Sequence, residues 1–193
     1  MNVLMVYAHP RADSLSAALR DAAKGSLEAA GHSVELLDLH AEGFRAALTA
    51  EESTIFRDRG GDLDDVRAHT EALRRADALV LVHPTWWFGM PAILKGWLDR
   101  VWSHGVAFRV APRGIEGMLT NIRKIAVVTT YGSPWWVIWW VGRIDRKLVK
   151  RGIAVLCAKG CKVEWLSLTR LDTRRREECE AFVARVRAHF ARW

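Results

Sequence analysis

The sequence predicts an α/β fold, in which a five-stranded parallel sheet is covered by helices on both of its faces. Continuous apolar runs such as residues 3–8 and 78–82 have the composition of strands that are buried on both sides. Segments with helical spacing of their apolar residues separate these runs along the chain. No internal repeat, linker or low-complexity tract divides the sequence, so we expect residues 1–193 to form a single domain.

The first half of the chain alternates between strand and helix patterns. Leu15, Ala18, Leu19, Ala22 and Leu27 form an apolar stripe at helical spacing, and Gly31 stands where that helix would end. The expected elements are a strand over residues 3–8, a helix over 14–31, a strand over 33–39, an irregular polar loop with the break RGGD over 40–62, a helix over 63–76 and a strand over 77–84.

The second half continues the same alternation. Pro91 suits a first helical turn, and Lys95 and Asp99 are spaced to pair on the outer face of the helix that follows. The expected elements are a helix over residues 91–102, a glycine-containing loop over 105–122, a strand over 123–130, a helix over about 140–151, a fifth strand within 154–168 interrupted at Gly160, and a closing helix from about 174 with the stripe Cys179, Phe182, Val183, Val186 and Phe190.

The charge pattern argues against a nucleic-acid-binding protein, although the net charge is +7. The basic run at residues 173–176 is followed at once by acids, which is typical of a solvated face. No apolar run reaches the ~18 residues that a membrane span needs. The N-terminus has no basic region before its apolar run, so we interpret it as a first strand and expect a cytoplasmic protein.

The three cysteines do not predict a metal site. Cys157 and Cys161 are close in sequence and Cys179 stands apart, but no second Cys/His pair completes a zinc-binding set. We therefore expect buried or idle thiols and no metal.

Three unusual loops follow the first, third and fourth predicted strands. They are residues 8–16 (AHPRADSLS), 83–91 (HPTWWFGMP) and 129–136 (TTYGSPWW). The carboxyl ends of parallel strands lie at one edge of the sheet, where α/β proteins bind their ligands. The convergence of three such loops predicts a binding site. Neither G-x-G-x-x-G nor G-x-x-x-x-G-K occurs, which excludes the dinucleotide fingerprint and the P-loop.

The residues of these loops suit a flat aromatic ligand with a phosphate. Ser14 is either a helix N-cap or, with Ser16 and free N–H groups, part of a phosphate site. His9 is either a phosphate donor or a structural histidine. The second loop offers aromatic surface and backbone N–H groups, while Thr129 and Thr130 supply hydroxyls and Tyr131 and Gly132 a ring and a close backbone approach.

The segments PTWWFGMPAILKGWLDRVW (84–102), YAHPRADSLSAAL (7–19) and TTYG (129–132) resemble the flavodoxin-like NAD(P)H:quinone oxidoreductase family. The resemblance runs from residue 1 to about 150. It implies a flavodoxin-like sheet with strand order 2-1-3-4-5, a bound FMN or FAD, and NAD(P)H as co-substrate. It also implies two-electron transfer to a quinone-like acceptor by a ping-pong mechanism.

The resemblance also implies roles for particular residues, although it names no catalytic residue. The isoalloxazine ring would be held by Pro84, Thr85, Trp86, Trp87 and Phe88. The phosphate would be held by His9, Ser14, Leu15 and Ser16. Thr129, Thr130, Tyr131 and Gly132 would border the ring, and the substrate would meet Trp87, Tyr131, Trp135 and Trp136.

The sequence departs from the family pattern in three places. Leu15 and Ser16 replace Phe-Asn, Tyr131 replaces a glycine, and the region after Gly132 lacks the Tyr and His that handle charge on the reduced flavin in mammalian quinone reductases. Arg143 is a candidate for that positive charge. An electron-carrier flavodoxin, or a non-catalytic regulatory subunit of a transport system, remains as an alternative function.

The Trp-rich segment 135–140 has three possible roles, namely a lid, a dimer interface or a partner-binding patch. Because members of the family usually dimerise, we expect a homodimer with this segment in its interface beside the flavin.

Overall fold

The computed structural model describes residues 1–59, 63–112 and 114–193 and contains the expected five-stranded sheet. Its strands are β1 (Asn2–Tyr7), β2 (Ser33–Asp38), β3 (Ala78–Pro84), β6 (Lys124–Thr130) and β7 (Lys162–Leu168). They lie in the order β2-β1-β3-β6-β7, and every neighbouring pair is parallel. This confirms the predicted order 2-1-3-4-5, counted along the chain.

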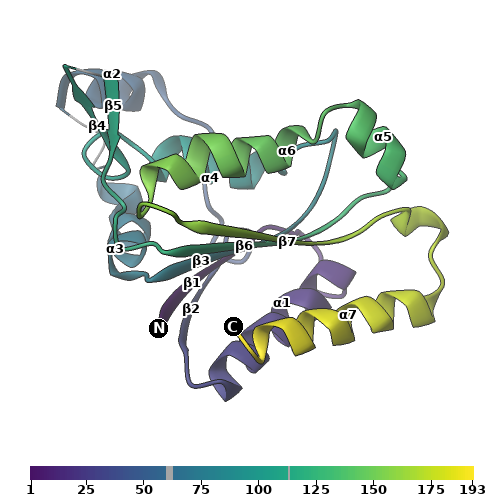
Figure 1. Cartoon of the computed structure of the whole chain (residues 1–193). Helices are drawn as coiled ribbons and strands as arrows, with labels where there is room; N and C mark the ends of the chain where they lie inside the picture. The colour runs from purple at the N-terminus through teal and green to yellow at the C-terminus, as the bar shows by residue number, and fades with distance from the viewer. Residues whose placement is uncertain (60–62, 113) are drawn as a thin grey trace.

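Helices cover both faces of the sheet (Figure 1). On one face, α1 (Leu15–Ala29) and α7 (Arg176–Phe190) pack against alternate strand residues such as Met5 and Val80. On the other face, α3 (Arg67–Arg75), α4 (Ala92–Val101) and a π-helix (Leu148–Ile153) pack against the residues between them, such as Leu4 and Leu79. The two-residue period of the strands thus divides the core into two layers.

The predicted loop over residues 40–62 is wrong in part, because α2 (Ala50–Arg59) occupies its second half. Thr49 and Glu52 form a capping box, in which the Glu52 N–H donates to Thr49 Oγ1 at 3.1 Å and the Thr49 N–H to Glu52 Oε2 at 2.7 Å. The helix lacks an apolar stripe, which is why periodicity missed it. Residues 60–62 of the expected RGGD break lie outside the described residues.

The predicted loop over residues 105–122 is also wrong in part. It contains an antiparallel hairpin of β4 (Phe108–Ala111) and β5 (Gly114–Gly117), in which Val110 pairs with Ile115. Both of these side chains are exposed, so the hairpin carries no alternation of buried and solvent-facing residues that would predict strands.

The helix expected over about 140–151 is split and starts earlier. The chain forms α5 (Trp135–Trp140), turns at Gly142 and Arg143, both with positive φ, and continues as α6 (Ile144–Lys147) into the π-helix. A short 3-10 helix (Ala154–Leu156) then precedes β7, which begins after Gly160 rather than being interrupted by it. Two further 3-10 turns, η1 (Asp64–Val66) and η4 (Leu171–Thr173), precede α3 and α7.

The described residues contain no helix that is long and apolar enough to cross a membrane. Nor do they contain a group of three or more His, Cys, Asp or Glu side chains arranged to hold a metal ion. The three cysteines are free thiols, of which Cys157 is buried.

Candidate functional site

A pocket of about 450 Å³ lies at the carboxyl edge of the sheet, between the ends of β3, β6 and β7. It brings together residues from the second and third unusual loops and adds residues from the loop after β7. The lining residues are Pro84, Thr85, Trp86, Trp87, Phe88, Thr130, Tyr131, Gly132, Ser133, Leu171 and Asp172. The position agrees with the general rule for open parallel sheets.

The turn at Trp86–Gly89 gives the pocket its most unusual feature. Trp87 and Phe88 both have left-handed backbone, with φ of 52° and 59°. Trp86 and Gly89 close the turn by exchanging two backbone hydrogen bonds of 3.1 and 3.0 Å. Left-handed backbone costs a residue with a Cβ roughly 1–2 kcal/mol, and such strain is concentrated at functional sites.

This turn leaves two backbone donors free at the pocket. Across the described residues, no acceptor contacts the N–H of Trp87 or of Phe88. The Trp87 side chain is 97% exposed, so its indole does not hold the turn in place. The strained turn therefore presents aromatic surface and two N–H groups to whatever enters the pocket.

Hydrogen bonds between β3 and β6 fix the floor of the site. The Thr85 N–H donates to the Thr130 carbonyl at 2.8 Å, and the hydroxyls of Thr85 and Thr129 lie 2.8 Å apart. Thr129 is fully buried and does not line the pocket, unlike Thr130. Thr129 thus lies beneath the predicted ring site and holds Thr85.

The first loop lies beside the pocket but does not line it. The His9 and Trp86 rings are 6.2 Å apart between centroids. His9 Nδ1 accepts from the Arg11 N–H at 3.0 Å, which leaves Nε2 as the donor nitrogen. Burial lowers the pKa of His9, so this ring is the neutral form at neutral pH.

Ser14 acts as the N-cap of α1, since its hydroxyl accepts from the Ala17 N–H at 3.1 Å. The next two N–H groups, those of Leu15 and Ser16, contact no acceptor among the described residues. The Ser16 side chain is buried and that of Leu15 packs against the core. The first loop therefore offers two free backbone donors at a helix start, beside the capping hydroxyl of Ser14.

Tyr131 connects the pocket to a buried carboxyl group. Its hydroxyl donates to Asp145 Oδ2 at 2.6 Å, and Asp145 is only 2% exposed. Burial, and then the neighbouring Asp145, raise the pKa of Tyr131 well above its usual range, so the phenol stays protonated. Tyr131, which stands where the resembled pattern has a glycine, is therefore held in place by its hydrogen bond to Asp145.

A second buried polar group lies at the end of β3. His83 is fully buried, and its Nδ1 lies 3.0 Å from the Pro84 carbonyl and donates to it. Its Nε2 has no partner among the described residues, and burial lowers the pKa of the ring. His83 is accordingly neutral.

A fourth loop, which the sequence did not predict, also lines the site. Leu171 and Asp172 follow β7, and the N–H groups of Arg170 and Leu171 donate to the carbonyls of Ser133 and Tyr131 at 3.1 and 2.9 Å. A Cβ on Gly132 would lie 2.6 Å from Asp172 Oδ2, so the glycine allows this approach. The rule that ligands bind beyond strand ends, applied to the fifth strand, would have found both residues.

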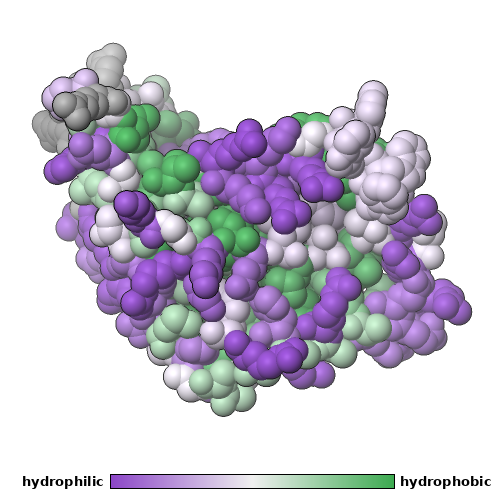
Figure 2. All heavy atoms as spheres, viewed as in Figure 1, coloured by the Kyte–Doolittle hydropathy of each residue, from purple (hydrophilic) through white to green (hydrophobic). Residues whose placement is uncertain are grey.

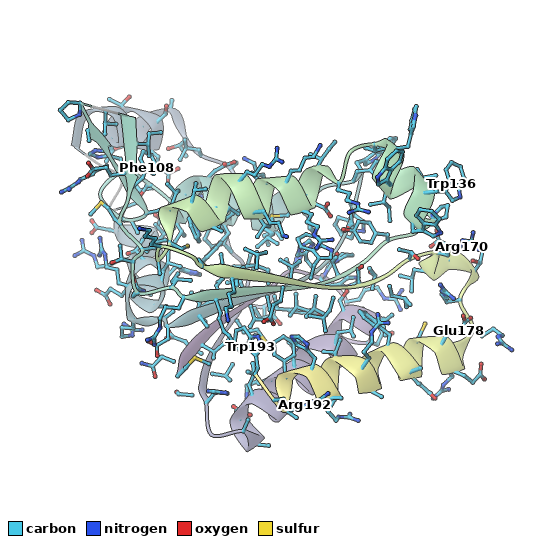
Figure 3. The ribbon with its side chains drawn as sticks, viewed as in Figure 1. Phe108, Trp136, Arg170, Glu178, Arg192 and Trp193 are labelled. Carbon is cyan, nitrogen blue, oxygen red and sulfur yellow. The ribbon has the colours of Figure 1, made fainter. Side chains whose placement is uncertain are left out.

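Trp135 and Trp136 do not line this pocket. Trp135 lines a smaller pocket of about 140 Å³ on the other side of Tyr131, together with Ile138, Arg143, Arg146, Trp165, Ser167 and Thr169. Arg143 has left-handed backbone, with φ of 52°. Figure 3 shows Trp136 and Arg170 close together at one end of the molecule.

A family model described as a flavodoxin-like fold matches residues 1–188. The chain belongs to the flavodoxin-like fold family. Solved structures of this fold include the Streptococcus mutans protein Smu.1420, which is 30% identical and has a TM-score of 0.90. The match covers 100% of both chains. An NAD(P)H:quinone oxidoreductase from Methanothermobacter marburgensis is 28% identical with a TM-score of 0.85, over 99% of this chain and 98% of that one.

Curated relatives match over a shorter span. A ribosyldihydronicotinamide dehydrogenase-like protein from Penicillium crustosum is 36% identical over 155 residues, which are 68% of this chain and 58% of that protein. The chain thus spans less than two thirds of the length of this relative.

Proposed function

We propose that the protein is a flavin-dependent oxidoreductase that passes two electrons from NAD(P)H to a quinone or a similar small aromatic acceptor. The observation that carries the proposal is the strained turn Trp86–Gly89, with its two free N–H groups at the pocket. The names of two similar proteins, an NAD(P)H:quinone oxidoreductase and a ribosyldihydronicotinamide dehydrogenase-like protein, support the same activity.

The lining of the pocket fits a flavin, either FMN or FAD. The N–H groups of Trp87 and Phe88 would donate to the polar edge of the isoalloxazine ring, and Trp86 and Tyr131 offer flat surface beside it. The free N–H groups of Leu15 and Ser16 at the start of a 15-residue helix suit its phosphate, with His9 Nε2 as a further donor. A bound flavin would supply the hydride-accepting ring, which no side chain provides.

The protein's own part in the reaction is to position the reacting rings and to shield them from water. The part-buried contact between Thr85 and Thr129 and the buried Tyr131–Asp145 hydrogen bond support the floor of the pocket. NAD(P)H gives up a hydride and leaves as NAD(P)⁺, and the acceptor departs with two electrons and two protons. Since nicotinamide and acceptor are both flat rings, we propose that they use one slot in turn, in a ping-pong mechanism.

Steady-state kinetics test this proposal. NAD(P)H oxidation at several concentrations of a soluble quinone should give parallel lines in double-reciprocal plots. Intersecting lines would show that both substrates bind together and would contradict the single slot. A protein that binds flavin but oxidises neither NADH nor NADPH with any quinone would instead be an electron carrier or a regulatory subunit.

We also propose that the chain acts as a homodimer. The pocket is open beside Trp87, whose indole is 97% exposed, and a second copy placed there would shield the slot from water. Sedimentation of the purified protein tests this, and a monomer at the concentrations used for kinetics would contradict it.

A further inference from the structure

Four indoles of one short helix face solvent. Within α5, the side chains of Trp135, Trp136, Trp139 and Trp140 are 66%, 55%, 63% and 79% exposed, whereas Ile138 is buried. We call these four residues the tryptophan corner. They form a pale cluster at one corner of the molecule in Figure 2, where α5 lies in Figure 1. Exposed apolar clusters of this kind mark interaction sites.

Basic side chains lie beside the tryptophan corner and along the helical segment that follows it in the chain. Arg143 and Arg146 line one pocket with Trp135, and Figure 3 shows Arg170 next to Trp136. None of these basic side chains forms a salt bridge within the described residues, and all but the half-buried Arg146 are exposed; they are Arg143, Arg146, Lys147, Lys150, Arg151 and Arg170. Of the acids that neighbour these residues in the chain, Asp145 is buried and bonded to Tyr131, and Asp172 lines the pocket. The partner of this surface should therefore be both anionic and able to take up indoles.

A second copy of the chain fits this surface poorly. A two-fold interface centred on this patch would bring the same basic surface of both copies together. Juxtaposed like charges in an interface are strongly unfavourable. These charges favour a partner other than a second copy, whereas the sequence predicted a dimer interface here.

An anionic bilayer surface fits both features. Indoles prefer the headgroup level of a membrane, where one edge of the ring is apolar and the other hydrated. Lysine and arginine beside them are attracted to anionic lipids, and a surface contact of this kind needs no spanning helix. The corner is a convex projection, which suits a flat, soft surface better than a preformed groove.

We propose that the tryptophan corner docks the protein onto anionic lipid bilayers, so that its aromatic acceptor is taken up from the membrane. The second half of this statement rests on the proposed function. The pocket and the corner are adjacent in the chain, because Tyr131, Gly132 and Ser133 line the pocket and Pro134 is the N-cap of α5. A docked molecule would therefore hold the pocket close to acceptors dissolved in the lipid.

The test is flotation of the full chain with vesicles of phosphatidylcholine alone and of phosphatidylcholine mixed with phosphatidylglycerol. We expect binding to the mixed vesicles only, a blue shift of tryptophan fluorescence, and weakening by salt. Trp139→Ala with Trp140→Ala should weaken binding at least tenfold. Lys150→Glu with Arg151→Glu should do the same, since each cation at an anionic surface contributes about fivefold.

The matched control is Arg187→Glu with Arg192→Glu, which changes the net charge equally in the last turn of α7 and just after it, across the sheet from the tryptophan corner. This variant should keep more of its binding than the Lys150/Arg151 variant. Equal losses of vesicle binding in these two variants would show attraction by net charge alone and would overturn the proposal. A wild-type protein that does not bind anionic vesicles would also overturn it.

Sedimentation decides between the membrane and a second copy. A wild-type dimer that the Trp139/Trp140 variant dissociates would assign the corner to the dimer and overturn the proposal. Vesicle binding is measured without NAD(P)H or acceptor, so its failure leaves the proposed oxidoreductase activity intact. Conversely, docking without any NAD(P)H oxidation would sustain the bilayer contact and contradict the function.

Discussion

At the scale of single residues, the buried hydrogen bond between Tyr131 and Asp145 distinguishes this site from the pattern it resembles. The Tyr131 hydroxyl and the Arg146 N–H are the donors to the Asp145 carboxyl group, at 2.6 and 2.7 Å. A buried polar group that loses its partner carries the full cost of its desolvation. The pair should therefore contribute to stability as well as to the shape of the pocket.

Tyr131→Phe should lower the free energy of unfolding by about 2 kcal/mol, because it leaves the buried Asp145 oxygen without its donor. The loss should be smaller when Asp145→Asn is already present, since the group left unpaired is then uncharged. Urea unfolding of the two single variants and the double variant measures this coupling. Additive losses would show that the two side chains do not act as a pair.

Glu52 provides a prediction about pH. Its hydrogen bonds from Arg45 above all, then from the Thr49 N–H and from Arg100, lower the pKa of its carboxyl group from 4.5 to about 2. A carboxyl group with a lower pKa in the folded state contributes stability above its unfolded pKa, and that stability is lost as pH falls from 4.5 towards 2.

Glu52→Gln should therefore be less stable than wild type at neutral pH, and the difference should shrink as the pH falls through this window. Urea midpoints for both proteins at a series of acidic pH values measure it. A difference that stays constant down to the lowest pH would contradict the assigned role of Glu52. The same residue ties α2 to α4 through Arg100, which is only 1% exposed.

At the scale of elements, two glycines in helices should respond oppositely to the same change. A Cβ on Gly96 in α4 would lie 2.3 Å from the Ala46 carbonyl oxygen, whereas a Cβ on Gly25 in α1 meets nothing within 4 Å. Gly25→Ala should stabilise the protein by about 1 kcal/mol through helix propensity alone. Gly96→Ala should destabilise it despite the same propensity gain, and thermal unfolding of both variants separates the two effects.

The strained turn Trp86–Gly89 should lower the stability of the protein while it presents its N–H groups to a ligand. Trp87→Gly relieves left-handed strain and should stabilise the protein by roughly 1 kcal/mol, while Trp87→Ala keeps the strain and should be nearly neutral. Because the indole is exposed, neither change loses packing. Equal stabilities of the two variants, by urea unfolding, would show that the positive φ of Trp87 stores no strain.

At the scale of the whole molecule, the strands followed from the sequence because buried parallel strands leave clear apolar runs, whereas their order followed from the resemblance to the flavodoxin-like family. Leu79, Val80 and Leu81 are fully buried, as such a run requires. The helix α2 was not predicted because an ion network around Glu52 and Arg100, rather than an apolar stripe, holds it against the rest of the fold. The capping pair Thr49 and Glu52 was the signal that would have revealed it.

The candidate site was predictable to a similar degree. Three loops with unusual composition predicted a site at the sheet edge where the pocket lies, and most of the residues expected to hold the ring line that pocket. The composition around Leu171 and Asp172 is not unusual, so only their position at the end of the fifth strand indicates that they belong to the site. The orientation of the Tyr131 side chain depends on its hydrogen bond to Asp145, 14 residues away along the chain. No local sequence pattern reveals that contact.

The most direct test of the central claim is a titration of FMN and of FAD with the purified protein, followed by flavin fluorescence. The pocket at the sheet edge should quench the fluorescence of one of them at one flavin per chain, and Phe88→Pro, which cannot adopt a positive φ and has no N–H, should abolish the quenching in a folded protein. A wild-type protein that quenches neither flavin, and that carries none after purification, would contradict the assignment of this pocket.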